Sequence, residues 1–178
     1  MNALLTKKVA KLEHEKQTML KKVEGLSIKQ LNQQPEANSW SAGQVIDHLL
    51  GAENKVMDYI EKKIQDPTVL KPASLKTKLR STILNISLKS SIKFKAPKAV
   101  AIAAENNDLV QLTNDWNQTR ERLNKLLKNL DKSLLDKEIF RHPTAGRINM
   151  YQTLEFMTLH INHHQMQIDS ILNKINRS

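Results

Sequence analysis

The sequence predicts an all-α protein, and specifically a four-helix bundle. Only four glycines and five prolines occur in 178 residues, which is too few for a turn-rich β fold. Hydrophobic residues make up 39% of the chain, enough to build the core of one domain spanning residues 1–178. Apolar residues also recur at three- and four-residue steps in four segments, so we expect helices near residues 3–24, 42–64, 107–130 and 149–176.

The first two predicted helices have clear boundaries. Gly25 ends the helix at 3–24, and a polar connection follows it. Ser41 then stands three residues before Gln44, a spacing that lets the two side chains satisfy each other's free backbone N–H groups in a capping box. We therefore expect the second helix, 42–64, to begin directly after Ser41.

The third and fourth predicted helices lie in the second half of the chain. The segment 107–130 is the clearest amphipathic pattern, with apolar residues at Leu109, Leu112, Trp116, Leu123, Leu126, Leu127 and Leu130. Residues 140–149 are expected to form a loop. Asn149 can cap the final helix, with Gln152 at its third position.

The crossover between the second and third helices, Pro67–Ala104, is strongly basic. It contains eight Lys or Arg residues and no acidic residue, in a chain whose net charge is +10. Such a segment can attract phosphates, anionic lipids or a carboxylate-rich small molecule, or it can be a solvated flap. The sequence lacks a recognition helix, zinc fingers and aromatic RNA platforms, so no specific nucleic-acid partner is expected.

Several features bear on the compartment. There is no cysteine, which excludes disulfides and thiolate ligands. The N-terminus carries too many charges for a secretory signal, and no apolar run approaches the roughly 18 residues that a membrane span needs. A cytoplasmic protein is the default expectation.

The last predicted helix contains two histidines, His160 and His164, that are one helical turn apart. Side chains at this spacing lie on the same face of a helix, so the two imidazoles can grip one metal ion. At about 100° per residue, His164 falls inside the apolar stripe and His160 on its edge. His163 falls at about −60° and should point away from that stripe.

The second predicted helix supplies a candidate third ligand, His48, which also borders an apolar stripe. Two helices packed through such stripes could bring three imidazoles together inside a bundle. Three protein ligands leave a coordination position open, which is typical of a catalytic metal site rather than a structural one. The alternative is that these are packed, hydrogen-bonded histidines without metal.

Other polar residues near these segments have plainer interpretations. Gln167 could line the margin of a cavity, but an ordinary interhelical hydrogen bond is the simpler role. His142 and Arg147 could reach an anionic substrate, or could serve only loop packing and capping. Trp40 is most simply a hydrophobic staple packing onto Val45 at the start of a helix.

Two motifs resemble a known family. The phrase WSAGQVIDHLLGAE (Trp40–Glu53) and, much later, HPTAGRINMYQTLEFMTLHINHHQMQI (His142–Ile168) are similar to the DinB/YfiT-like superfamily of four-helix bundles. The resemblance implies a metal held by one histidine of the second helix and two of the last, which correspond to His48, His160 and His164. It also implies a homodimer, and an activity with low-molecular-weight thiols and a small-molecule substrate.

The functional hypothesis is a metal-dependent enzyme in which zinc or nickel activates a small thiol, as in an S-transferase, or water, as in a hydrolase. A non-catalytic metal-binding bundle or interaction module is the main alternative. Nucleic-acid binding through the basic crossover is a third.

Overall fold

The computed structural model describes residues 2–73, 106–143 and 145–176. Four long helices account for most of them: α1 (Ala3–Val23), α3 (Ala42–Ile64), α5 (Leu109–Asn129) and α6 (Met150–Ile175). The predicted all-α four-helix bundle is confirmed, with helix ends within about two residues of those expected. Most of the basic crossover, residues 74–105, lies outside the described residues; its beginning forms the short 3-10 helix η1 (Pro67–Val69).

The helix starts follow from capping side chains. The predicted capping boxes of Ser41 with Gln44 and of Asn149 with Gln152 are both present. At the N-terminus the Asn2 side chain accepts a hydrogen bond from the backbone N–H of Leu5. These local hydrogen bonds satisfy N–H groups that a helix end would otherwise leave unpaired.

Helices α1 and α6 run parallel to each other, and so do α3 and α5. Lys8 pairs with Glu155 and Lys22 with Asp169, both at a sequence separation of 147 residues. A constant separation along two helices means that they run in the same direction. The same holds for α3 and α5. Asn54 bonds to Thr119 and Asp58 to Arg122, at nearly constant sequence separations of 65 and 64 residues.

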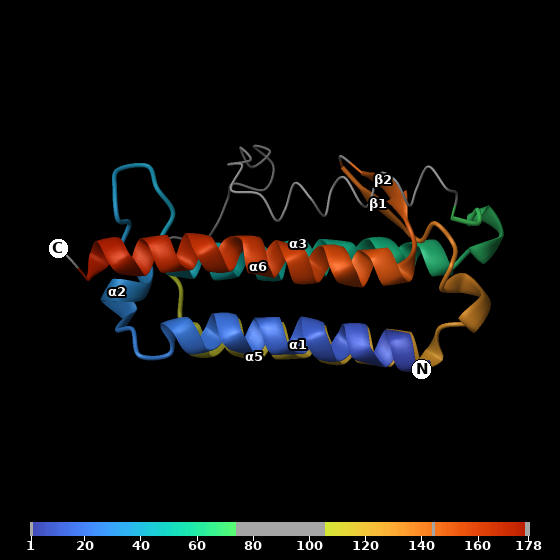
Figure 1. Ribbon diagram of the computed structural model, residues 1–178, viewed down its shortest axis with the longest axis horizontal. Helices are drawn as coiled ribbons and strands as arrows, with labels where there is room; N and C mark the ends of the chain where they lie inside the picture. The colour runs from blue at the N-terminus through green and yellow to red at the C-terminus, as the bar shows by residue number, and fades with distance from the viewer. Residues whose placement is uncertain (1, 74–105, 144, 177–178) are drawn as a thin grey trace.

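The two parallel pairs are antiparallel to each other (Figure 1). Across α1 and α5, Glu13 meets Arg120 while Lys16, one turn later, meets Asn117, one turn earlier. The order around the bundle is therefore α1, α6, α3, α5. Because α3 and α5 are parallel neighbours, α5 begins at the end of the bundle where α3 begins. The connection from the end of α3 to the start of α5 must therefore cover the length of a 23-residue helix, about 34 Å. The long crossover is a consequence of this topology.

The core lies between the four helices. The apolar stripe expected on α6 is buried, including Met157, Ile161, Ile168, Ile171 and Ile175. On α3 the buried residues include Val45, Leu49, Val56 and Ile60. With these two stripes buried, His48 and His160 are half-buried, and His164 is buried.

Several small elements of the described chain were not predicted, including the 3-10 helix η3 (Lys132–Leu134) after α5. The connection after α1 contains α2 (Ile28–Asn32), a five-residue helix capped by Ser27, in which only Leu31 is buried. The expected loop at 140–149 contains an antiparallel hairpin of β1 (Phe140–His142) and β2 (Gly146–Ile148). These elements are too short for a periodic apolar pattern to develop. Gly146 supplies the positive φ of 74° beside the hairpin turn.

Replacing Gly43 by alanine should destabilise the fold. A Cβ at Gly43 would lie 2.7 Å from the Cβ of Asn107, whose backbone is held on both sides by the Asn32 side chain. Overpacking of this kind costs about 1–3 kcal/mol, against a helix-propensity gain of about 1 kcal/mol. Thermal or urea unfolding should show a net loss of stability relative to the wild type.

Gly51→Ala is the matched control in the same helix. A Cβ at Gly51 meets nothing within 4 Å, so this variant should gain about 1 kcal/mol. Equal stability changes in the two variants would contradict the proposed steric origin.

Candidate metal centre

Three histidines converge at the contact between α3 and α6. The Nε2 atom of His160 lies 3.4 Å from Nε2 of His48 and 3.2 Å from Nε2 of His164. One ligand nitrogen from each ring lies within 4.8 Å of those of the other two. The structure thus brings together the three residues that the sequence singled out.

The spacing of these nitrogens matches what a metal ion requires. Zinc–nitrogen bonds of 2.0–2.1 Å in tetrahedral geometry put two ligand nitrogens about 3.4 Å apart. The observed separations around His160 are 3.2 and 3.4 Å. Around His160 the donor spacing therefore suits one shared divalent ion, and the ligand nitrogens of His48 and His164 lie within 4.8 Å of each other.

Burial keeps the imidazoles of His160 and His164 neutral. Loss of solvent lowers the pKa of His160 well below its usual value, and the neighbouring His164 and His48 lower it further. The pKa of His164 is lowered to about 3, again chiefly by burial and then by His48. Neutral imidazole is the form that binds metal, so these rings are in the ligand state at neutral pH.

Gln167 orients His164. The Nδ1 atom of His164 lies 2.8 Å from the Oε1 atom of Gln167, three residues later on the same helix. Because an amide oxygen only accepts hydrogen bonds, the proton of His164 belongs on Nδ1 and the lone pair of Nε2 faces the other histidines. This hydrogen bond lies within α6, whereas the sequence favoured a bond between helices for Gln167. Its spacing from His164 was the signal that could have revealed this role.

His163 lies beside the cluster but is not one of the three converging residues. Its ring centroid is 5.3 Å from that of His164, with the rings nearly perpendicular. The helix phase places His163 about 100° from His164, which accounts for this difference between adjacent histidines.

Aromatic rings surround the cluster. Trp40 contacts His48 at a centroid distance of 5.1 Å, and Phe156 stacks on His160 at 5.5 Å. The sequence suggested only a staple for Trp40 and no role for Phe156. Phe156 stands one turn before His160 on α6, a spacing that places the two rings on the same face.

The hairpin continues this aromatic layer. His142 meets Phe156 at 4.4 Å, and burial lowers the pKa of His142 to about 4. Its Nδ1 atom accepts a hydrogen bond from the backbone N–H of Ala145, so one role of His142 is to close the hairpin turn. Arg147 is exposed and pairs in register with Arg141.

Comparison with known proteins places the chain in a family. The model of the DinB superfamily matches residues 11–168. The chain belongs to the DinB superfamily. It is 24% identical to the uncharacterized protein YuaE of Bacillus subtilis (strain 168) over 156 residues, covering 88% of this chain and 91% of YuaE.

The fold of this DinB-superfamily protein is also similar to that of a solved structure. YfiT from Bacillus subtilis, described as a probable metal-dependent hydrolase with an unusual four-helix bundle topology, matches with a TM-score of 0.62. The match covers 99% of this chain and 90% of YfiT at 17% identity. Among the described helices of the present protein, none is long and apolar enough to cross a membrane.

Proposed function

We propose that His48, His160 and His164 hold one divalent metal ion, and that the protein is a metal-dependent enzyme for a small-molecule substrate. The observation that carries this proposal is the convergence of three imidazoles whose Nε2 atoms are spaced by 3.2 and 3.4 Å around His160. Three protein ligands leave a position for a further ligand, as catalytic sites require. Zinc and nickel both suit imidazole nitrogen.

The residues of the chain have distinct tasks in this proposal. A bound divalent ion would act as a Lewis acid that makes a water or thiol ligand acidic near neutral pH. Gln167 holds the proton of His164 on Nδ1, and Phe156 and Trp40 pack against the rings of His160 and His48. This low-polarity surrounding strengthens electrostatic interactions at the site.

Two nucleophiles fit the site, and each has its own support. Activation of a low-molecular-weight thiol in an S-transferase reaction is implied by the family motifs at Trp40–Glu53 and His142–Ile168. Activation of water is favoured by the description of YfiT as a probable metal-dependent hydrolase. The homodimer and the cytoplasmic location stay predictions.

One experiment tests both reactions. The protein is loaded with zinc or nickel and assayed with a panel of cellular thiols against a model electrophile, and in parallel with ester and amide substrates without thiol. We expect turnover that disappears after chelation and in His48→Ala. Equal rates for the wild type and His48→Ala would contradict a metal-dependent reaction. Metal binding without turnover of any substrate would favour the non-catalytic bundle.

Gln167→Ala should weaken metal binding about 10- to 100-fold, because His164 would lose the acceptor that fixes its tautomer and ring orientation. Gln167→Glu keeps an acceptor and should retain the affinity. The measurement is competition for zinc against a chelator of known affinity.

Gln165→Ala is the matched control, since the Gln165 side chain bonds instead to Glu15 of α1. It should leave zinc affinity unchanged. Equal losses at the two glutamines would mean that α6 packing, rather than orientation of His164, determines the affinity.

A further inference from the structure

A recess lies between α1 and α5 and shares no residue with the histidine cluster. It has a volume of about 490 Å³, and its lining combines the apolar residues Val9, Ala10, Leu12 and Leu123 with polar residues that include Glu13, Lys16 and Arg120. A recess of this size falls within the range of small-molecule sites, which are mostly apolar with a few polar groups that orient the ligand.

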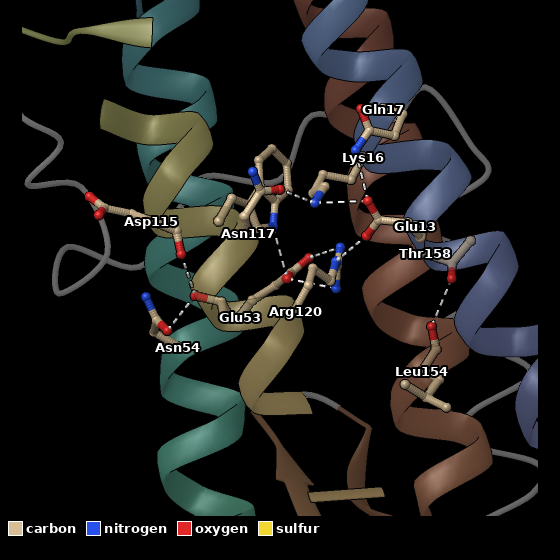
Figure 2. Close-up of polar contacts among 12 residues, drawn as sticks. Glu13, Lys16, Gln17, Glu53, Asn54, Asp115, Asn117, Arg120, Leu154 and Thr158 are labelled. Atoms are coloured by element: carbon tan, nitrogen blue, oxygen red, sulfur yellow. Dashed lines mark hydrogen bonds and ion pairs between the residues drawn. The ribbon is translucent and has the colours of Figure 1, made fainter. Parts of the chain in front are cut away.

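The cations of this recess are buried. The Lys16 side chain is only 1% exposed; its Nζ atom donates to Oδ1 of Asn117 at 2.8 Å and lies 2.8 Å from a carboxylate oxygen of Glu13. The Arg120 side chain is 7% exposed and forms an ion pair at 2.9 Å with Glu53, which is also buried. Figure 2 shows these side chains directed toward one another between the helices.

The positive charges of Lys16 and Arg120 are neutralised only if Glu13 contributes a carboxylate besides that of Glu53. Glu53 can neutralise one of the two cations, and the second depends on Glu13, whose carboxylate also lies 3.4 Å from Nε of Arg120. Unlike the other three, the Glu13 side chain is 40% exposed, and it belongs to the lining of the recess. The carboxylate of Glu13 therefore contacts the two buried cations from the solvent-exposed side of the recess.

We propose that this recess is a binding site for small monocarboxylates with an apolar body, and that the ligand carboxylate replaces Glu13 as the partner of Lys16 and Arg120. If Glu13 turns toward solvent, a buried cation is left without its counter-charge, which is costly unless another anion takes its place. A carboxylate fits both the ammonium and the guanidinium group. The accessible apolar side chains of Val9 and Ala10 in the lining favour a hydrocarbon group behind it.

The test uses benzoate as the ligand probe and benzamide as its uncharged analogue of similar shape. Isothermal titration is carried out on the full-length wild type, Glu13→Gln and Lys16→Met. We expect Glu13→Gln to bind benzoate roughly five- to tenfold more tightly than the wild type, because the competing carboxylate is gone. Lys16→Met should lose benzoate binding, and benzamide should not distinguish the three proteins.

Benzoate binding at a metal ion would be the same in all three proteins, so only differences between them report on the recess. Equal benzoate affinities, or no binding by Glu13→Gln, would overturn the proposal. If Lys16→Met does not fold, the comparison of Glu13→Gln with Glu121→Gln decides, because Glu121 lines the same recess and forms no ion pair with Lys16 or Arg120 among the described residues. Equal gains in benzoate affinity for Glu13→Gln and Glu121→Gln would also overturn the proposal.

Discussion

Replacing His160 by alanine should abolish tight binding of a divalent metal ion. His160 is the central member of the cluster, since its Nε2 atom is the one that lies within 3.4 Å of both other Nε2 atoms. Two imidazoles from different helices would remain, without the nitrogen between them. Because each ligand contributes directly to the binding free energy, we expect a loss of at least about 100-fold in zinc affinity, measured by chelator competition.

His163→Ala is the matched control, because it removes an imidazole from the same turn of α6 that is not among the converging ligands. It should keep zinc affinity within a small factor of the wild type. Similar losses in both variants would contradict the assignment of His160 as a ligand. Catalytic rates should follow metal content, and therefore fall in His160→Ala only.

Replacing Glu53 by alanine should destabilise the bundle by about 3–5 kcal/mol, because it leaves buried positive charge without its partner. The Glu53 carboxylate, 2% exposed, accepts hydrogen bonds from Nε1 of Trp116 and Nη2 of Arg120, each at 2.9 Å (Figure 2). Burial raises the pKa of Glu53, and the charge of Arg120 opposes that shift. Urea unfolding should show the loss as a lower midpoint.

Glu61→Ala is the control with the same chemistry at the surface. Glu61 is also a glutamate of α3 paired with an arginine of α5, and accepts two hydrogen bonds from Arg122 at 2.7 and 2.6 Å. Its side chain is 38% exposed, so the loss should be below about 1 kcal/mol. Comparable losses of stability for Glu53→Ala and Glu61→Ala would show that burial does not determine how much these ion pairs contribute to stability.

The positions of the four long helices were predictable because the signals are local. Capping at Ser41 and Asn149 depends on residues three positions apart, and amphipathic periodicity depends on one turn at a time. The same reasoning accounts for the histidine pair on α6, whose spacing alone puts both rings on one face. The short elements α2 and β1–β2 escaped prediction because their signals extend over too few residues.

The sequence by itself determined where the helices form, which stripes are buried and which histidines can share a ligand. Only the tertiary structure decided that α1 pairs in parallel with α6 and α3 with α5, and that Lys16 is buried, although a lysine on a helix face normally suggests solvent. An apolar stripe indicates that one face of a helix will be buried, but it does not indicate which helix packs against that face. Asn117 bonds to Lys16 from α5, and Trp116 and Arg120 bond to Glu53 from that same helix, so the burial of Lys16 and Glu53 depends on the assembled bundle.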